Sequence, residues 1–231
     1  MTADALRARA RALLAARADP KRAPAMKAYM KSAMPFHGVG APALRLIARE
    51  LFGAIELPTE RAYADAVLGL FRGATHREEW TLAVLLTKHR RGGLRFRTMS
   101  TLPIYEEMIV TAAWWDIVDD LASHAVGSLV LASRAEGSTA MKKWSRDAHL
   151  WKRRTSILHQ LRYRTETDTK LLEACIEGSW SDRDFFARKA IGWALRQYAR
   201  TDPAWVRRFV EAHAERLSPL SIREATRHLQ G

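Results

Sequence analysis

The segment Ala112–Asp119, with the sequence AAWWDIVD, carries two tryptophans and two carboxylates within six residues. Trp115 and Asp119 are four residues apart and would share one face of a helix. Trp114 would point about 100° away from Trp115, so the two indoles cannot both face one core direction. An indole beside a carboxylate can hold a positively charged group through its π face and by direct charge attraction. The competing interpretation is that one Trp is a core residue and Asp119 is a solvated or capping acid.

A second candidate is Arg154, in the segment WKRRTSILHQL that begins at Trp151. Trp151, Leu158 and Leu161 form an apolar stripe at helical spacing, and Arg154 takes the remaining position on it. A buried cation without a partner is costly, so Arg154 needs an anionic partner. That partner is a carboxylate in a buried salt bridge or a bound phosphate, and the sequence leaves both open.

Lys189 repeats this pattern, because it lies four residues from both Phe185 and Trp193. Basic side chains interleaved with aromatic ones on one helix face are typical of a nucleic-acid surface. Long lysine stems also simply cover apolar surface, which is the alternative for Lys189.

The segment 38–42, with the sequence GVGAP, places glycines directly before a predicted helix. Backbone N–H groups leading into a helix N-terminus can bind a phosphate. A plain loop between helices is the equal alternative. A dinucleotide-binding fingerprint is excluded because no strand precedes the glycines.

The charge of the chain indicates a polyanionic partner. Lys and Arg number 38 against 25 acids, which gives a net charge of +13. Nucleic acid is the commonest partner of such a chain, and an anionic membrane surface is the second. Arg accounts for 29 of the 38 basic residues and suits bidentate phosphate contacts, although a GC-rich genome would also enrich Arg and Ala.

Composition predicts an all-α, intracellular protein. Ala and Leu number 64 against 18 Val and Ile, a ratio that favours helices over strands. No apolar run approaches the length of a membrane span, and the arginine-threaded N-terminus lacks the apolar core of a signal peptide. The single Cys175 forms no internal disulfide and no multi-cysteine metal cage, which fits a reducing cytoplasm. The length favours one domain over residues 1–231, with Arg91-Gly92-Gly93 as a loop inside it.

Helical signals with short breaks run along the whole chain. Thr75 with Glu78 has the spacing of a capping box, and Asp202-Pro203 and Ser218-Pro219 are cap-plus-proline helix starts. A chain of many short helices is compatible with two architectures. One is an α-solenoid of stacked helix pairs with a period of about 40 residues, and the other is a compact helical bundle. The predicted helices span residues 3–18, 23–34, 42–51, 59–72, 75–90, 102–113, 116–131, 139–148, 150–163, 168–177 and 181–198, and two more begin at 203 and 219.

The sequence resembles, essentially over its whole length, the HEAT-like-repeat alkylpurine DNA glycosylases of the AlkD type. The resemblance implies a right-handed α-solenoid of stacked HEAT-like helix pairs, whose concave basic face holds duplex DNA. It also implies excision of cationic N3- and N7-alkylated purines by a monomeric bacterial enzyme of the cytoplasm, associated with the nucleoid when bound to DNA. No metal and no organic cofactor are expected. The matching stretches are AMKAYMKSAMPFHGVGAPALR, TAAWWDIVDDLASH, WKRRTSILHQLRYR, DFFARKAIGWALRQYAR and LSPLSIREATRHL.

The resemblance also implies roles for particular residues. Trp115 and Asp119 match the family's catalytic Trp and Asp, and Arg154 matches the Arg of its catalytic cleft. The chain departs from the family at Gly40 and Ala41, where members often carry polar DNA-contacting side chains. The expected DNA- and lesion-binding residues are Tyr29, Trp193, Lys189, Lys31, Arg45, Arg188 and Arg223.

The implied chemistry requires few groups. An N3- or N7-alkylpurine is already cationic, so the base departs neutral and needs no general acid; one carboxylate then suffices, unlike the pair of most sugar hydrolases. Asp119 would stabilise the oxocarbenium-like sugar and orient water, Trp115 would shield the site, and Arg154 would hold a nearby backbone phosphate.

Two other classes of protein fit parts of the sequence. One is a non-catalytic helical-repeat scaffold that binds nucleic acid or protein, in which WWDIVD is packing. The other is a helix-hairpin-helix repair enzyme, at which GVGAP hints weakly. The presence of Trp115, Asp119 and Arg154 together argues against the scaffold, and base release from methylated DNA would separate the glycosylase from the scaffold. The absence of a borohydride-trapped enzyme–DNA adduct would count against a lysine-based lyase.

Overall fold

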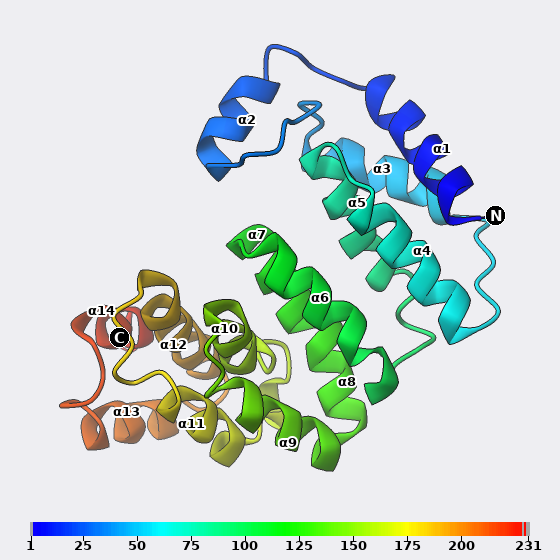
Figure 1. Cartoon of the computed structure of the whole chain (residues 1–231). Coiled ribbons are helices and arrows are strands. Elements are labelled where there is room, and N and C mark those ends of the chain that lie inside the picture. Colours follow the sequence, from blue (N-terminus) through cyan, green and yellow to red (C-terminus); the bar gives the residue numbers. More distant parts are fainter. Residues whose placement is uncertain (1, 228, 230–231) are drawn as a thin grey trace. The chain divides into compact units, whose positions relative to one another are not determined.

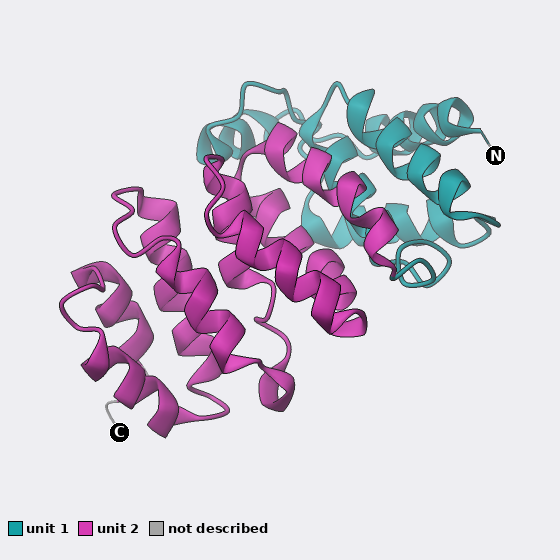
Figure 2. Cartoon of the chain, turned by 60° about the horizontal axis from the view of Figure 1, so that its bottom comes forward, with its two compact units in different colours: residues 1–97 teal, residues 98–231 magenta. Residues whose placement is uncertain are grey.

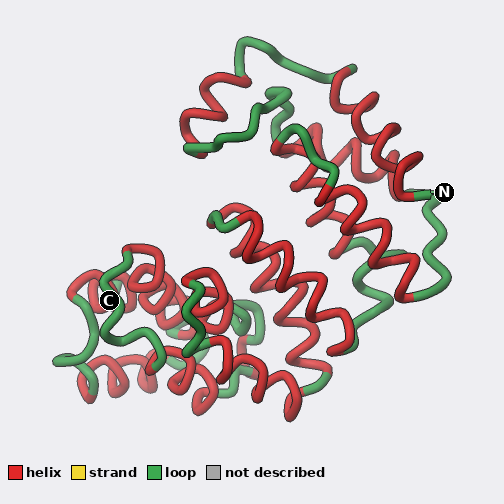
Figure 3. The backbone as a smooth tube through the Cα atoms, viewed as in Figure 1, coloured by secondary structure: helices red, strands yellow, loops and turns green. Residues whose placement is uncertain are grey.

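The computed structural model describes residues 2–227 and residue 229. Every regular element among these residues is helical (Figure 3), which confirms the predicted all-α class. The chain divides into two compact units, unit 1 over Met1–Arg97 and unit 2 over Thr98–Gly231 (Figure 2). That the two units act as one domain stays a prediction, as do the handedness of the stack and its concave basic face.

Unit 1 contains the first five α-helices, labelled in Figure 1. The helix α1 packs against α3, α4 and α5, and α4 packs against α5. The core is apolar at helical spacing: Leu6, Ala10 and Leu14 of α1 are all buried. The helices are α1 (Ala3–Ala15), α2 (Ala23–Met30), α3 (Ala41–Phe52), α4 (Glu60–Arg72) and α5 (Arg77–Thr87).

Unit 2 contains the remaining helices, which pack mostly on near neighbours along the chain. The helix α10 packs against α9, α11 and α12, and α12 packs against α13 and α14. Such neighbour-to-neighbour packing is typical of stacked helical repeats. The elements are η1 (Met99–Thr101), α6 (Leu102–Ala112), α7 (Trp115–Asp120), η2 (Leu121–Val126), α8 (Gly127–Ala132), α9 (Arg134–Trp144), α10 (Leu150–Leu158), η3 (Arg164–Glu166), α11 (Thr169–Glu177), α12 (Phe185–Tyr198), α13 (Pro203–Ala212) and α14 (Pro219–Thr226).

The cap-plus-proline starts are confirmed. The Asp202 side chain accepts a hydrogen bond from the N–H of Trp205 at 2.8 Å, and Ser218 Oγ accepts one from the N–H of Ser221 at 3.0 Å. Each cap satisfies a donor that the first turn of a helix leaves without a backbone partner. Pro203 and Pro219 then occupy the first turn, where the missing N–H costs nothing.

Two predicted helix starts are wrong by several residues. The helix placed at 139–148 runs from Arg134 to Trp144, because Gly137 is buried inside it against Val130 and does not break it. The helix placed at Ser181 begins at Phe185, because Asp184 supplies the cap and its side chain accepts from the N–H of Phe186 at 2.6 Å.

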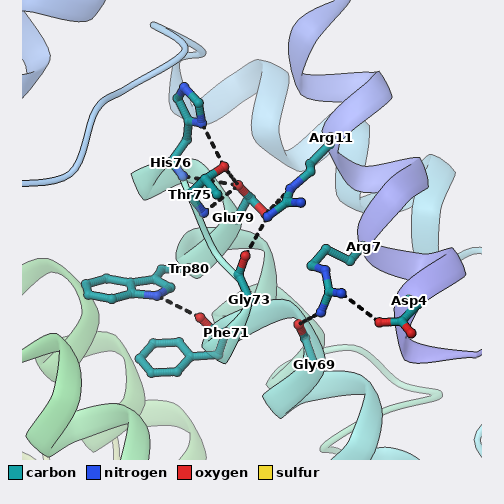
Figure 4. Close-up of polar contacts among 10 residues, drawn as sticks. All are labelled: Asp4, Arg7, Arg11, Gly69, Phe71, Gly73, Thr75, His76, Glu79 and Trp80. Carbon is teal, nitrogen blue, oxygen red and sulfur yellow. Dashed lines mark hydrogen bonds and ion pairs between the residues drawn. The ribbon is translucent and has the colours of Figure 1, made fainter.

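The capping box at the start of α5 forms one residue later than predicted. His76 is the N-cap, and the Glu79 carboxylate accepts hydrogen bonds from the N–H of His76 at 3.1 Å and of Thr75 at 2.9 Å. Glu79 also accepts from Arg11 Nε of α1 at 2.9 Å (Figure 4). Burial by itself would raise the pKa of Glu79, but these hydrogen bonds outweigh it and hold the pKa below its usual value. The buried carboxylate thus joins α1 to α5.

Replacing Glu79 is expected to destabilise the chain strongly. Glu79→Ala removes the capping box and leaves Arg11 without its carboxylate, so the free energy of unfolding should fall by about 2–4 kcal/mol in urea denaturation. Asp4→Ala is the control, since the Asp4 side chain is 84% exposed in its pair with Arg7 (Figure 4) and should cost below about 1 kcal/mol. Equal losses in the two variants would contradict the role given to Glu79.

Helical geometry changes directly after the segment that carries Asp119. The single helix predicted over 116–131 is a continuous helical run in which α7 passes into the π-helical η2 and then into α8. Ser123 Oγ donates to the carbonyl of Asp119 at 2.9 Å within this run. Short π-helical segments are frequent at functional sites, because the wider turn changes the direction of the flanking side chains.

The described residues contain neither a membrane-spanning helix nor a cluster of metal-ligating side chains. None of their helices has the length and hydropathy that a membrane span requires. No group of three or more His, Cys, Asp or Glu side chains among them is arranged to hold a metal ion.

Candidate active site

A residue with left-handed backbone conformation lies between the helix α6 and the two tryptophans of the AAWWDIVD segment. Ala113 ends α6 with φ of 43°, a conformation that carries a strain of about 1 kcal/mol for a residue other than Gly. Trp114 is extended, and α7 begins at Trp115. The two indoles therefore diverge because Trp114 lies in extended backbone and Trp115 in the helix, and not through helical rotation alone.

The two indoles have different surroundings. The Trp114 ring lies 5.4 Å from the ring of Phe186 and 6.2 Å from that of Trp151, in an aromatic cluster between α7, α10 and α12. Trp151 and Phe186 complete this cluster at 5.0 Å. Trp115 instead lines a pocket together with Asp119, as their four-residue spacing predicts. The cluster fixes where α7 begins and so fixes the direction of Trp115.

The pocket has a volume of about 340 Å³ and lies within unit 2. The helix α7 contributes an indole and a carboxylate, α10 contributes one guanidinium, and α12 contributes three aromatic rings and two cations. Aromatic walls with one carboxylate suit a flat, positively charged ligand. The lining residues are Trp115, Asp119, Arg154, Phe185, Phe186, Lys189, Trp193 and Arg196.

Arg154 and Asp119 form a bidentate ion pair at this pocket. Arg154 Nε donates to Asp119 Oδ1 at 2.7 Å, and Arg154 Nη2 donates to Oδ2 at 2.8 Å. Arg154 Nη1 donates to the carbonyl of Phe186 at 2.5 Å. The side chains are 4% and 14% exposed for Arg154 and Asp119. Of the two partners that the sequence left open for Arg154, the structure contains the carboxylate.

The surroundings of Asp119 raise the pKa of its carboxyl group. Burial raises the pKa of Asp119 above its usual value, and the nearby Asp116 and Asp120 add to this, while Arg154 opposes it. A carboxylate in a pocket whose pKa is raised by burial and opposed by one specific charge partner is a candidate functional group. Asp119 is therefore the chemically distinctive group of the pocket.

Five of the residues predicted from the sequence line this one pocket. They are Trp115, Asp119, Arg154, Lys189 and Trp193. Arg188 and Arg223 lie outside the lining, on α12 and α14, where Arg188 Nε donates to the carbonyl of Asp184 at 3.3 Å and Arg223 is exposed.

Three predicted DNA-binding residues belong to unit 1. Tyr29, in the last turn of α2, is 75% exposed, an unusual position for a large aromatic ring. Lys31 follows as the left-handed C-cap of α2 with φ of 48°, and Arg45 is exposed on α3. All three therefore face solvent in their own unit.

Three lining residues were not predicted as site residues, Phe185, Phe186 and Arg196, and neither was Glu224 of α14. Arg196 lies seven residues after Lys189, so the helical face that runs from Phe185 through Lys189 and Trp193 would have included it. No local signal marks Glu224, which reaches this face from another helix.

The GVGAP loop is held from inside unit 1. The buried Glu78 carboxylate accepts hydrogen bonds from the N–H groups of His37, Gly38 and Val39 at 3.1, 2.9 and 3.1 Å. Gly38 is required here, since its φ is +85° and a Cβ would lie 2.1 Å from the carbonyl oxygen of Asp19. These N–H groups already have an anionic partner, so the plain-loop interpretation fits better than a phosphate site.

A family model and a solved structure both relate this chain to DNA alkylation repair enzymes. A family described as DNA alkylation repair enzyme matches residues 10–229. A solved structure described as a predicted DNA alkylation repair enzyme from Enterococcus faecalis is similar with a TM-score of 0.83 and 28% identity, over 93% of this chain and 97% of that one. No curated protein matches the chain. The chain belongs to the DNA alkylation repair enzyme family.

Proposed function

We propose that the chain is a monofunctional DNA glycosylase that releases cationic N3- and N7-alkylated purines from duplex DNA by hydrolysing the N-glycosidic bond. The observation that carries the proposal is the Asp119 carboxylate, held by Arg154 in a pocket walled by Trp115, Phe185 and Trp193. Membership of a DNA alkylation repair family supports DNA as the substrate. The net charge of +13 supports binding to a polyanion.

The pocket has the groups that this reaction needs. A cationic alkylpurine leaves as a neutral base, so no proton donor has to act on it. Among the described residues that line the pocket, Asp119 is the one carboxylate, and none is His, Cys or Tyr. A pair of carboxylates, of which one protonates the leaving group, is typical of enzymes that cleave neutral glycosides.

In the proposed reaction, Asp119 acts on the sugar. As the C1′–N bond breaks, the bonding electrons go to the departing base and positive charge develops on the sugar. The fixed carboxylate stabilises this charge and orients a water molecule, whose oxygen bonds to C1′ as it loses a proton to solvent. The aromatic rings of Trp115 and Trp193 favour the cationic base through their π faces.

Arg154 is proposed to act through Asp119. Its bidentate contact fixes both carboxylate oxygens, and its charge opposes the effect of burial, which favours the neutral acid. The phosphate contact predicted for Arg154 would have to reach a side chain that is 4% exposed. The more exposed cations of the pocket, Lys189 and Arg196, suit a backbone phosphate better.

The DNA contacts outside the pocket stay proposals. Tyr29, Lys31 and Arg45 in unit 1 and Arg188 and Arg223 in unit 2 supply one aromatic ring and four cations for backbone and lesion contacts.

The direct test is base release. Purified protein is incubated in excess over a duplex with a single N7-methylguanine, and the free base is measured. We expect release of N7-methylguanine and an abasic strand without a covalent enzyme–DNA adduct after borohydride treatment. Binding of the duplex without any release would reject the glycosylase and favour a DNA-binding scaffold, and a trapped adduct would indicate lyase chemistry.

The pH dependence of release should show a single acidic limb. The ionised carboxylate of Asp119 is the active form, so activity is present above its pKa and is lost as the pH falls through it. Because burial raises that pKa, the limb should lie above the usual titration range of Asp. Single-turnover rates from about pH 4 to 9 would measure it. A second limb on the alkaline side would reveal a general acid and contradict the mechanism.

A further inference from the structure

The carboxylate of Glu224 lies between two cations that line the candidate active site. Glu224 Oε1 accepts a hydrogen bond from Lys189 Nζ at 2.7 Å, and Oε2 accepts one from Arg196 Nη1. Both cations belong to α12 and lie seven residues apart, whereas Glu224 comes from α14. Glu224 does not line the pocket itself.

The packing of α14 on α12 fixes this carboxylate. Gly192 lies where the two helices meet, and a Cβ there would come within 2.5 Å of Glu224 Cβ, so no larger residue fits. Ser221 Oγ, one turn before Glu224, donates to the carbonyl of Arg188 at 2.8 Å. The Glu224 side chain is 10% exposed, and its contact with Lys189 holds the pKa of this carboxyl below its usual value.

The charges around the pocket explain why this pairing matters. Three cations and one carboxylate line the pocket, and the carboxylate of Asp119 is paired with Arg154. Lys189 and Arg196 would then repel a cationic base. The carboxylate of Glu224 contacts both Lys189 and Arg196, and its negative charge offsets part of their positive charge. The same contact limits how freely the two cations can turn toward DNA phosphates.

We propose that Glu224 is a positioning residue, which holds Lys189 and Arg196 at the pocket wall and offsets their charge so that a cationic base can occupy the pocket. This inference rests on the proposed function for its substrate. In this role, Glu224 determines the balance between excision of damaged bases and binding to undamaged DNA. Loss of its charge moves these two properties in opposite directions.

Glu224→Gln tests this proposal, because glutamine keeps the shape and removes the charge. We expect N7-methylguanine release to slow by about tenfold or more under single-turnover conditions. Binding to undamaged duplex should tighten several-fold, with a log–log salt slope steeper by about 0.9 for each phosphate newly engaged. Glu224→Asp, which keeps the charge, should recover part of the excision rate. A packing defect would weaken both properties together.

The control is Glu166→Gln, which makes the same change in net charge at an exposed pair with Arg134, away from the pocket. It should leave excision and the salt slope close to those of the wild-type chain. In Glu224→Gln combined with Lys189→Gln, the gain in affinity should be smaller than in Glu224→Gln, since Arg196 is then the one cation released.

The outcomes are distinct. Unchanged or weaker binding of undamaged duplex by folded Glu224→Gln, with an unchanged salt slope, overturns the proposal. If Glu224→Gln does not fold, Lys189→Gln alone decides: because Glu224 holds this cation in the wild-type chain, the salt slope for undamaged duplex should stay unchanged, and a shallower slope overturns the proposal. A wild-type chain that releases no base rejects the glycosylase, while the binding measurements still test the role of Glu224.

Discussion

Asp119→Asn should release N7-methylguanine about 10²-fold more slowly than the wild-type chain, the scale of losing one preorganised electrostatic group at a reacting centre. Asparagine keeps the size of the side chain and removes the negative charge that stabilises the sugar. It also leaves Arg154 with a neutral partner, and breaking a buried pair costs about 3–5 kcal/mol of stability in other proteins. Rates are therefore measured in single turnover, at a temperature where circular dichroism shows the variant folded.

Asp182→Asn is the matched control for this variant. Asp182 Oδ2 accepts hydrogen bonds from Arg153 Nε at 3.1 Å and Nη2 at 2.6 Å, so Asp182 is also paired with a guanidinium of α10, through one carboxylate oxygen. Its side chain is 13% exposed, close to the 14% of Asp119, and it does not line the pocket. Asp182→Asn should excise near the wild-type rate. Equal rates for Asp119→Asn and the wild-type chain would reject the mechanism.

Release should depend on the charge of the damaged base by several orders of magnitude. N3-methyladenine and N7-methylguanine carry their own positive charge and should leave, whereas uracil, hypoxanthine and 8-oxoguanine should stay in the DNA. The neutral bases would need protonation as they depart, and the described residues that line the pocket offer two guanidinium groups, one ammonium and one carboxylate. A guanidinium is too weak an acid to donate a proton at neutral pH.

Matched duplexes that differ only in the damaged base measure this dependence, with the wild-type chain in excess. The same duplexes incubated without protein serve as the control for spontaneous loss of N7-methylguanine. Efficient uracil release would show that a proton donor acts in the pocket, and Lys189 would be the first candidate because it is the one ammonium there.

The sequence alone determined the class of the fold and several residues of the candidate site. The Ala- and Leu-rich composition and the caps at Asp202 and Ser218 act within a few residues, so they specify helices and their starts without tertiary context. The spacing of Trp115 and Asp119 correctly puts both side chains on one pocket. The apolar stripe around Arg154 shows that this cation needs an anionic partner, which the structure contains.

The tertiary structure decided which groups meet. Arg154 and Asp119 are 35 residues apart in the sequence, and so are Lys189 and Glu224, and no periodicity links positions at such separations. Likewise, the choice of Glu79 over Glu78 for the capping box depends on distant partners, because Glu78 binds the backbone of the 37–39 loop from 40 residues away. Helix caps are contacts between residues that are close in the sequence. These buried pairs form only where two helices pack, so the tertiary structure, and not the order of the residues, decides which side chains are paired.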